Sequence, residues 1–161
     1  MATSNKNLSN VDSDGIGDMA PFQFAIVVSE WNAEVTESLY AGAMQTLLSL
    51  GADRSKIQRI NVPGSFELSL GAQWMAKREE VDAVICLGCV IQGETKHFDF
   101  ICQAVASGLT EVGLKYDKPV IFGVLTTNDH QQALDRAGGK HGNKGDEAAY
   151  TAAGMLTNRQ K

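Results

Sequence analysis

The chain has 161 residues, 43% of them hydrophobic and 20% charged, which is the size and composition of one globular domain. Its formal net charge of -5 argues against nucleic acid or an anionic membrane surface as a partner. The odd number of cysteines, 3, favours reduced thiols over a disulfide framework. The first twenty residues are polar and lack the apolar run of a secretory signal, so we expect a cytoplasmic protein.

Residues 1–20 are rich in Asn, Ser, Asp and Gly, and predict a flexible arm before a single domain over residues 21–161. Four short apolar runs with many β-branched residues predict strands in that domain. These runs are Phe24–Val28, Ile57–Val62, Ala83–Leu87 and Val120–Leu125. Three of them are almost continuously apolar, as expected for strands that helices cover on both faces.

Apolar residues at helical spacing fill the segments between these runs. The first stripe extends from Val35 to Leu50, with Asn32 as a candidate N-cap and Gly51 at the end. Further helices are expected over residues 65–78, 95–112 and 128–138, and from residue 143 onward. This alternation predicts a three-layer α/β/α sandwich around a four-stranded parallel sheet. Ligands of such folds bind at the carboxyl ends of the strands.

A candidate anion site follows the third run. Gly93 permits a tight turn and Thr95 can cap a helix, so the backbone N–H groups of Gly93, Glu94 and Thr95 can face an anion. His97 lies within the first turn of that helix, and an imidazole exchanges protons near neutral pH. Its position fits a proton shuttle, and equally an ordinary surface histidine.

Other candidate residues also allow two interpretations. Arg136 suits a phosphate clamp, or it is a basic residue that pairs with Asp135 or with the C-terminus of the preceding helix. Trp31, directly after the first run, is either a core residue or a platform for a flat heterocycle. Cys86 and Cys89 form a C-x-x-C pattern, but residues three apart on a strand point to opposite faces, which argues against a redox pair. A zinc site would need a second pair at ligand spacing, which the sequence does not offer.

Five blocks of the sequence together resemble the lumazine synthase (6,7-dimethyl-8-ribityllumazine synthase) family, over about residues 24–156. They are Trp31-Asn32, Val62 to Glu67 (VPGSFE), Leu87 to His97 (LGCVIQGETKH), Pro119 to Thr127 (PVIFGVLTT) and Arg136 to Gly145 (RAGGKHGNKG). The resemblance implies a flavodoxin-like fold. It also implies the condensation of 5-amino-6-(D-ribitylamino)uracil with 3,4-dihydroxy-2-butanone 4-phosphate, which releases phosphate and water in the penultimate step of riboflavin biosynthesis. We expect no metal and no cofactor, because each step moves a proton or expels phosphate.

The resemblance also assigns roles to individual residues. Trp31 would stack on the pyrimidine and His97 would be the general acid and base. Ser65 and Glu67 would hold the ribityl chain, with Phe66 as a further substrate-binding residue, and Cys89, Val90 and Ile91 would read the uracil edge. Gly93, Glu94, Thr95 and Arg136 would hold the phosphate, and Phe122 and Lys144 would complete the pocket. Many relatives have a small residue in place of Glu94, so we expect its backbone N–H to face the phosphate and its side chain to turn away.

The family assembles as pentamers with sites between subunits, and some members form an icosahedral shell of pentamers. Residues 140–143 (KHGN) resemble the turn of shell-forming members, which favours a shell. The arm is expected to pair with the sheet edge of a neighbouring subunit. Riboflavin synthase is a candidate partner, whereas nucleic acid and membranes are not expected.

Two alternatives are disfavoured. The related archaeal-type riboflavin synthase fits less well because residues 62–67 and 93–97 carry the complete Val-Pro-Gly-Ser-Phe-Glu and Gly-x-Thr-x-His patterns. A flavin or lumazine carrier, or a purely structural shell protein, would not need a proton shuttle such as His97 together with Arg136.

Overall fold

A parallel sheet forms the middle layer of the protein in a computed structural model, which describes residues 7–10 and 14–160. Its strands are β1 (Phe24–Ser29), β2 (Ile57–Val62), β3 (Ala83–Ile91) and β4 (Val120–Thr127), in the order β2-β1-β3-β4. All neighbouring strands are parallel. The predicted four-stranded parallel sheet is confirmed, and β3 and β4 continue beyond their apolar runs to Ile91 and Thr127.

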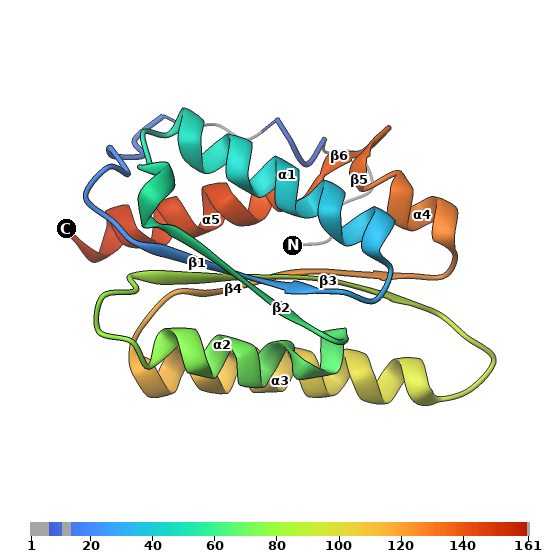
Figure 1. The fold of residues 1–161 in the computed structure, drawn as a ribbon. Helices are drawn as coiled ribbons and strands as arrows, with labels where there is room; N and C mark the ends of the chain where they lie inside the picture. The colour runs from blue at the N-terminus through green and yellow to red at the C-terminus, as the bar shows by residue number, and fades with distance from the viewer. Residues whose placement is uncertain (1–6, 11–13, 161) are drawn as a thin grey trace.

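Two pairs of helices cover the two faces of the sheet (Figure 1). Helices α1 (Ala33–Ser49) and α5 (Lys144–Arg159) lie on one face, and α2 (Leu68–Ala76) and α3 (His97–Tyr116) on the other. Alternate β1 residues point into two separate cores: Phe24 and Ile26 toward α1 and α5, Ala25 and Val27 toward α2 and α3. The predicted three-layer architecture is therefore confirmed. Within the described ranges, no helix is long and apolar enough to cross a membrane.

The expected helix over residues 128–138 is wrong beyond its first half. Helix α4 (His130–Leu134) ends early, and an antiparallel hairpin follows, made of β5 (Ala137–Gly139) and β6 (Gly142–Asn143). Gly138 and Gly142 have φ angles of 102° and 81°, which other residues rarely adopt, so the chain leaves the helical conformation here. The hairpin brings Arg136 beside Lys144, whose backbone N–H donates to the Arg136 carbonyl at 2.8 Å.

Two 3-10 turns each lead directly into a longer element. The first, η1 (Arg54–Lys56), leads into β2, and the second, η2 (Ser65–Glu67), leads into α2. The expected helix over residues 65–78 thus begins as a tighter turn, which displaces Ser65 to Glu67 from the axis of α2.

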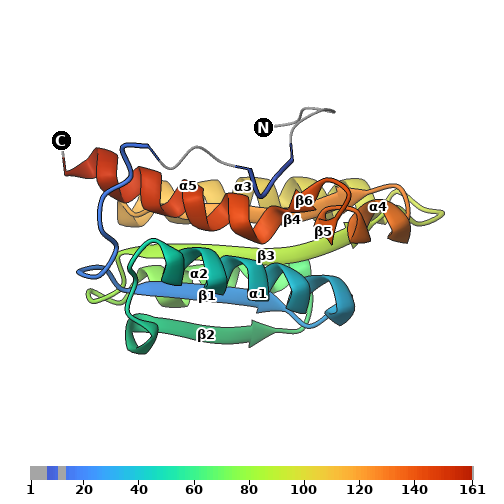
Figure 2. The same ribbon diagram turned by 90° about the horizontal axis from the view of Figure 1, so that it is seen from above.

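The described part of the expected arm contacts its own chain. Residues 14–20 cross the C-terminal end of α5, where the backbone N–H of Gly17 donates to Thr157 Oγ1 at 3.1 Å (Figure 2). Met19 is fully buried in the core, although it lies in the segment expected to be flexible. Farther toward the N-terminus, the Leu8 N–H donates to the His141 carbonyl at 2.7 Å. Pairing of the arm with a neighbouring subunit stays a prediction.

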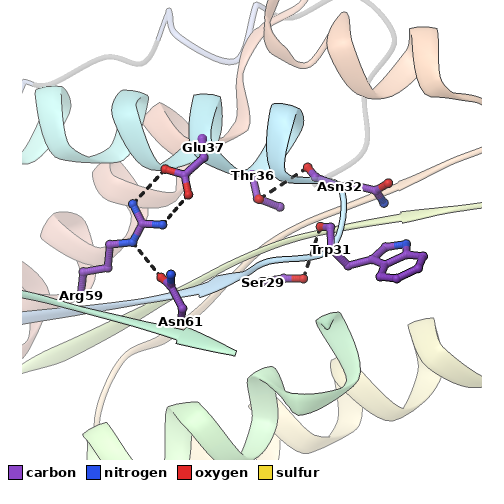
Figure 3. Close-up of polar contacts among 7 residues, drawn as sticks. All are labelled: Ser29, Trp31, Asn32, Thr36, Glu37, Arg59 and Asn61. Atoms are coloured by element: carbon purple, nitrogen blue, oxygen red, sulfur yellow. Dashed lines mark hydrogen bonds and ion pairs between the residues drawn. The ribbon is translucent and has the colours of Figure 1, made fainter. Parts of the chain in front are cut away.

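A polar cluster fastens the edge strand β2 to α1 (Figure 3). The Arg59 guanidinium donates to both carboxylate oxygens of Glu37, with Nη1 to Oε2 at 2.9 Å, and its Nε donates to Asn61 Oδ1 at 2.8 Å. It also lies over the Tyr40 ring, 4.3 Å from the centroid. Hydrogen bonding from Arg59 lowers the pKa of Glu37, so this carboxylate is ionised at neutral pH and the cluster holds α1 against the sheet edge.

Candidate functional site

A cavity of about 610 Å³ lies at the carboxyl end of the sheet, on the side of α2 and α3. Parallel α/β sheets bind ligands beyond the carboxyl ends of their central strands, and this cavity lies in that position. The residues that line it come from four segments of the chain: Trp31, Asn32, Gly64, Ser65, Phe66, Glu67, Cys89, Val90, Ile91, His97 and Ile101. Eight of them are predicted site residues, namely Trp31, Ser65, Phe66, Glu67, Cys89, Val90, Ile91 and His97.

The turn after β1 places Trp31 at the mouth of this cavity. Asn32 has a left-handed backbone with φ 60° and ψ 47°, a conformation that Asn adopts more readily than most residues. The chain therefore turns sharply, and the Trp31 indole projects away from the Glu37–Arg59 cluster (Figure 3). Trp31 is 72% exposed, which excludes the core interpretation and leaves a ring face open for stacking.

Asn32 is the N-cap residue of α1, as predicted, but its side chain makes no capping hydrogen bond and binds elsewhere. Its Nδ2 donates to the backbone carbonyl of Cys89 at 3.0 Å. The β1–β3 ladder ends at the Val28–Leu87 pair, so Cys89 has no strand partner on this side, and the Asn32 amide replaces it. Ser65 Oγ lies 3.5 Å from the same carbonyl. These two donors fix the orientation of the peptide groups of Cys89 to Ile91 that line the cavity.

Close packing keeps Ser65 at this carbonyl. A Cβ added to Gly88 would lie 2.7 Å from Ser65 Oγ and 2.8 Å from Leu68 Cδ1. A larger residue at position 88 would therefore push the η2 turn away from β3. The Leu-Gly-Cys order in the third block thus has a packing reason: glycine makes room for the turn that carries Ser65, Phe66 and Glu67.

His97 begins α3, directly after the predicted anion turn. The N-cap of α3 is Lys96, without a side-chain capping hydrogen bond, so the prediction that Thr95 caps this helix is wrong; Thr95 Oγ1 accepts from the His97 backbone N–H at 3.3 Å just before the first turn. Gly93, Glu94 and Thr95 are exposed on the loop beside the cavity. Backbone N–H groups at a helix start attract anions, and the exposed His97 imidazole lines the cavity one turn before Ile101. The arrangement can bind an anion within reach of a group that transfers protons.

Two predicted residues line a different surface of the chain. Phe122, on the edge strand β4, and Lys144, at the start of α5, line a groove of about 950 Å³ that also includes Leu114 and Met155. Lys144 Nζ forms an ion pair with Glu147 Oε1 at 2.7 Å. Within one described chain, these two residues and the Trp31 cavity therefore lie apart.

Arg136 lies at the base of the hairpin, outside the residues that line either cavity. The alternative of a pair with Asp135 is not what the structure shows, because Asp135 accepts from Lys140 Nζ at 2.9 Å and from Gln131 Nε2 at 3.0 Å. These hydrogen bonds, that from Lys140 first, lower the pKa of Asp135. Arg136 Nη1 donates to the Gln132 carbonyl at 3.0 Å, so the alternative of a contact with the C-terminus of the preceding helix, α4, is what the structure shows. In the part of the chain that is described, no carboxylate pairs with Arg136. Its charge is available to an anion.

The cysteines face opposite cores, as predicted. Cys86 packs with the α2 and α3 core and Cys89 with the α1 and α5 core. Burial raises the pKa of the Cys89 thiol to about 11, so it is protonated at neutral pH and a poor nucleophile. Across residues 7–10 and 14–160, the structure holds no cluster of three or more His, Cys, Asp or Glu side chains able to ligate a metal.

Sequence reasoning did not name Asn32, Gly64 and Ile101 as site residues, although they line the cavity. Ile101 follows His97 by four residues, so helical spacing alone puts the two on one face. Asn32 belongs to the Trp31-Asn32 block, which indicated a role near the site. Its contact with Cys89, which is 57 residues away in sequence, depends on the order of the strands in the sheet.

The fold and cavity define an α/β protein with an open cavity at the carboxyl end of a parallel sheet, lined by an exposed indole and an imidazole. Residues 21–160 match the family model described as 6,7-dimethyl-8-ribityllumazine synthase. The chain is 64% identical to the 6,7-dimethyl-8-ribityllumazine synthase of Cytophaga hutchinsonii, over 97% of this chain and 98% of the relative. It is 54% identical to the enzyme of that name from Flavobacterium johnsoniae, over 100% and 85% of the two chains. The chain belongs to the 6,7-dimethyl-8-ribityllumazine synthase family.

Proposed function

We propose that the Trp31 cavity is the substrate site of a 6,7-dimethyl-8-ribityllumazine synthase, a transferase of riboflavin biosynthesis. The enzyme condenses 5-amino-6-(D-ribitylamino)uracil with 3,4-dihydroxy-2-butanone 4-phosphate. One observation carries the assignment: an exposed indole, a clamped peptide edge and an imidazole beside an anion turn share one cavity. These are the groups needed to stack a pyrimidine, to read its edge and to move protons next to a phosphate.

Each part of the cavity takes one part of the substrates. The pyrimidine stacks on Trp31, and the peptide groups of Cys89, Val90 and Ile91 bind its polar edge. Ser65 and Glu67 hold the ribityl hydroxyls, with Phe66 next to them. The backbone N–H groups of Gly93, Glu94 and Thr95 bind the phosphate, and the guanidinium of Arg136 adds charge-assisted hydrogen bonds.

The chemistry is a sequence of proton transfers around one elimination. The primary amine of the uracil attacks the ketone carbon, and loss of water gives an imine. A proton is then removed from the carbon next to the imine, the carbon–oxygen bond to phosphate breaks, and the ribityl nitrogen closes the ring with loss of a second water. His97 takes and returns these protons, and the anion turn stabilises the departing phosphate. Positioning both substrates contributes much of the rate, since good orientation is worth several kcal/mol.

We also propose that two copies of the chain build each site. Phe122, Lys144 and Arg136 lie away from the Trp31 cavity of their own chain, so a second copy that presents its β4 and hairpin surface there would complete it. An arrangement in which one surface meets a different surface of the next copy closes into a ring. The ring we propose is a pentamer, in the cytoplasm, with further assembly into a shell. Riboflavin synthase, which consumes the lumazine, is the proposed partner.

The exposed apolar residues support this arrangement. Phe66 in η2 and Leu70 and Trp74 in α2 follow one another at intervals of four, and are 54%, 50% and 55% exposed. Leu70 and Trp74 lie on the face of α2 opposite its buried residues. Leu114, Phe122 and Met155 are also exposed and line the groove at β4. Apolar patches of this kind on a folded chain mark surfaces that another chain covers.

The assigned roles are tested by mixing both substrates with the wild type, His97→Ala and Arg136→Ala and following lumazine absorbance. We expect His97→Ala to lower kcat by roughly 10-fold or more, and Arg136→Ala to raise KM for the butanone phosphate by a similar factor, because a charge-assisted contact is lost. Lys77→Ala, on the exposed end of α2, serves as the control and keeps wild-type rates. Unchanged turnover in both site variants would contradict the roles of His97 and Arg136.

A further inference from the structure

One serine on α1 holds both strands of the hairpin that carries Arg136 and Lys144. Ser38 Oγ donates to the backbone carbonyl of Ala137 in β5. The backbone carbonyl of the same Ser38 accepts from Asn143 Nδ2 in β6 at 2.9 Å. The two bonds link positions 99 and 105 residues away in sequence to a single turn of α1. The hairpin lies beside the N-terminal half of that helix (Figure 1).

The remaining bonds of Asn143 tie the hairpin to α5. Its Oδ1 accepts from the Gly145 N–H at 2.8 Å and so caps α5, and the residue is only 8% exposed. There is no room for the hairpin to move toward α1, because a Cβ added to Gly42 would lie 2.7 Å from Asn143 Cγ. Asn143 is thus held between α1 and the first turn of α5.

The hairpin in turn fixes the two basic residues at its ends. The Lys144 N–H donates to the Arg136 carbonyl, and Lys140 is paired with Asp135 within the same segment. The hairpin therefore fixes the backbones of Arg136 and Lys144 relative to each other. A shift of the hairpin would move both cations together.

We infer that Ser38 is a positioning residue for the phosphate-binding Arg136, acting through its hydrogen bonds with Ala137 and Asn143. This inference rests on the phosphate role of Arg136 under the proposed function. It assigns Ser38 no contact with substrate. Removing its hydroxyl frees one strand of the hairpin, so Arg136 loses its fixed approach to the phosphate while the Trp31 cavity keeps its geometry.

The test is a comparison of KM values for the two substrates in Ser38→Ala. We expect KM for the butanone phosphate, and Kd for inorganic phosphate by calorimetry, to rise about 5- to 20-fold. KM for the ribitylaminouracil should stay within about twofold of wild type, since its contacts lie elsewhere. Alanine is a better helix former than serine, so α1 should fold in this variant. Ser38→Thr, which retains the hydroxyl, should restore phosphate binding.

Ser49→Ala is the matched control: it removes a serine hydroxyl from the same helix, one that donates to the Thr46 carbonyl at 2.7 Å far from the hairpin. It should leave both KM values unchanged. Asn143→Asp is the second variant, which retains the oxygen that caps α5 but loses the donor to Ser38, and it should show the same selective loss. If Arg136→Ala raises KM for the phosphate substrate but Ser38→Ala and Asn143→Asp do not, the inference about Ser38 is wrong and the proposed function stands. If Arg136→Ala itself has no effect, the phosphate role fails first.

Discussion

At the scale of single residues, the site depends on two neighbours with different tasks. Trp31 presents a ring face to the cavity, while Asn32 supplies the left-handed turn that directs it there and the amide that holds Cys89. Neither task can be exchanged for the other, because one needs an apolar ring and the other a short amide. The pair explains why an exposed aromatic residue is followed directly by Asn at the end of β1.

Replacing Trp31 tests the stacking role. Trp31→Ala should raise KM for the ribitylaminouracil by about 10- to 100-fold, since stacking of a base on an aromatic side chain is worth about 1–3 kcal/mol. Trp31→Phe retains a ring and should stay within about fivefold of wild type. Steady-state kinetics with each substrate varied in turn measure both values. Equal losses in the Ala and Phe variants would contradict stacking and point to a role of the indole N–H.

At the scale of elements, the packing of α1 against α5 sets the geometry of the hairpin between them. The two helices touch at Gly42 and Gly145, where neither position has room for a side chain. A Cβ on Gly145 would lie 1.9 Å from the Leu39 carbonyl oxygen, which is backbone and cannot rotate away. Because the hairpin leads directly into α5, this close contact of α1 with α5 also sets the position of the hairpin.

Gly145→Ala should therefore destabilise the protein by about 3 kcal/mol or more, because the helices must separate. Gly154→Ala, on the same helix, is the control, since among the described atoms none lies within 4 Å of an added Cβ. That variant should be unchanged or more stable by up to about 1 kcal/mol, as alanine favours a helix. Differential scanning calorimetry of the two variants gives the comparison, and a Gly145→Ala protein as stable as Gly154→Ala would refute the close packing.

At the scale of the whole molecule, the two halves of the proposed site lie on different surfaces of one chain. The Trp31 cavity lies beyond the carboxyl ends of the central strands β1 and β3, and the groove with Phe122 and Lys144 lies along the edge strand β4. A single chain would leave each half incomplete. Under the proposed function, the complete site forms where two copies meet, which gives a specific prediction about mixed assemblies.

Co-expression of His97→Ala and Arg136→Ala chains should give a higher kcat/KM for the butanone phosphate than either variant has alone. In a random mixture about a quarter of the contacts join an intact His97 half to an intact Arg136 half, which sets the expected recovery. Light scattering first verifies that the assemblies are at least pentamers, and particles no larger than a pentamer would contradict the shell. Mixing two His97→Ala preparations is the control and should restore nothing. No recovery in the mixed assembly would place Arg136 in the site of its own chain.

The sequence by itself determined the strands, the layers and most of the cavity. Continuous apolar runs and helical stripes depend on which faces are buried, and burial leaves a local pattern that can be read along the chain. The five blocks predicted Ser65, Cys89 and His97 as cavity residues because Ser65 and His97 begin elements and Cys89 lies near the carboxyl end of β3. Only the tertiary structure decided the Asn32 amide on Cys89 and the Ser38 contacts, which are bonds between residues 57 to 105 positions apart, and short-range patterns carry no information about such pairs. The hairpin at residues 137–143 is a local pairing, and the helical prediction missed it because Gly138 and Gly142 adopt positive φ angles. The separation of Phe122 and Lys144 from Trp31 is likewise a consequence of strand order, which the apolar runs do not encode.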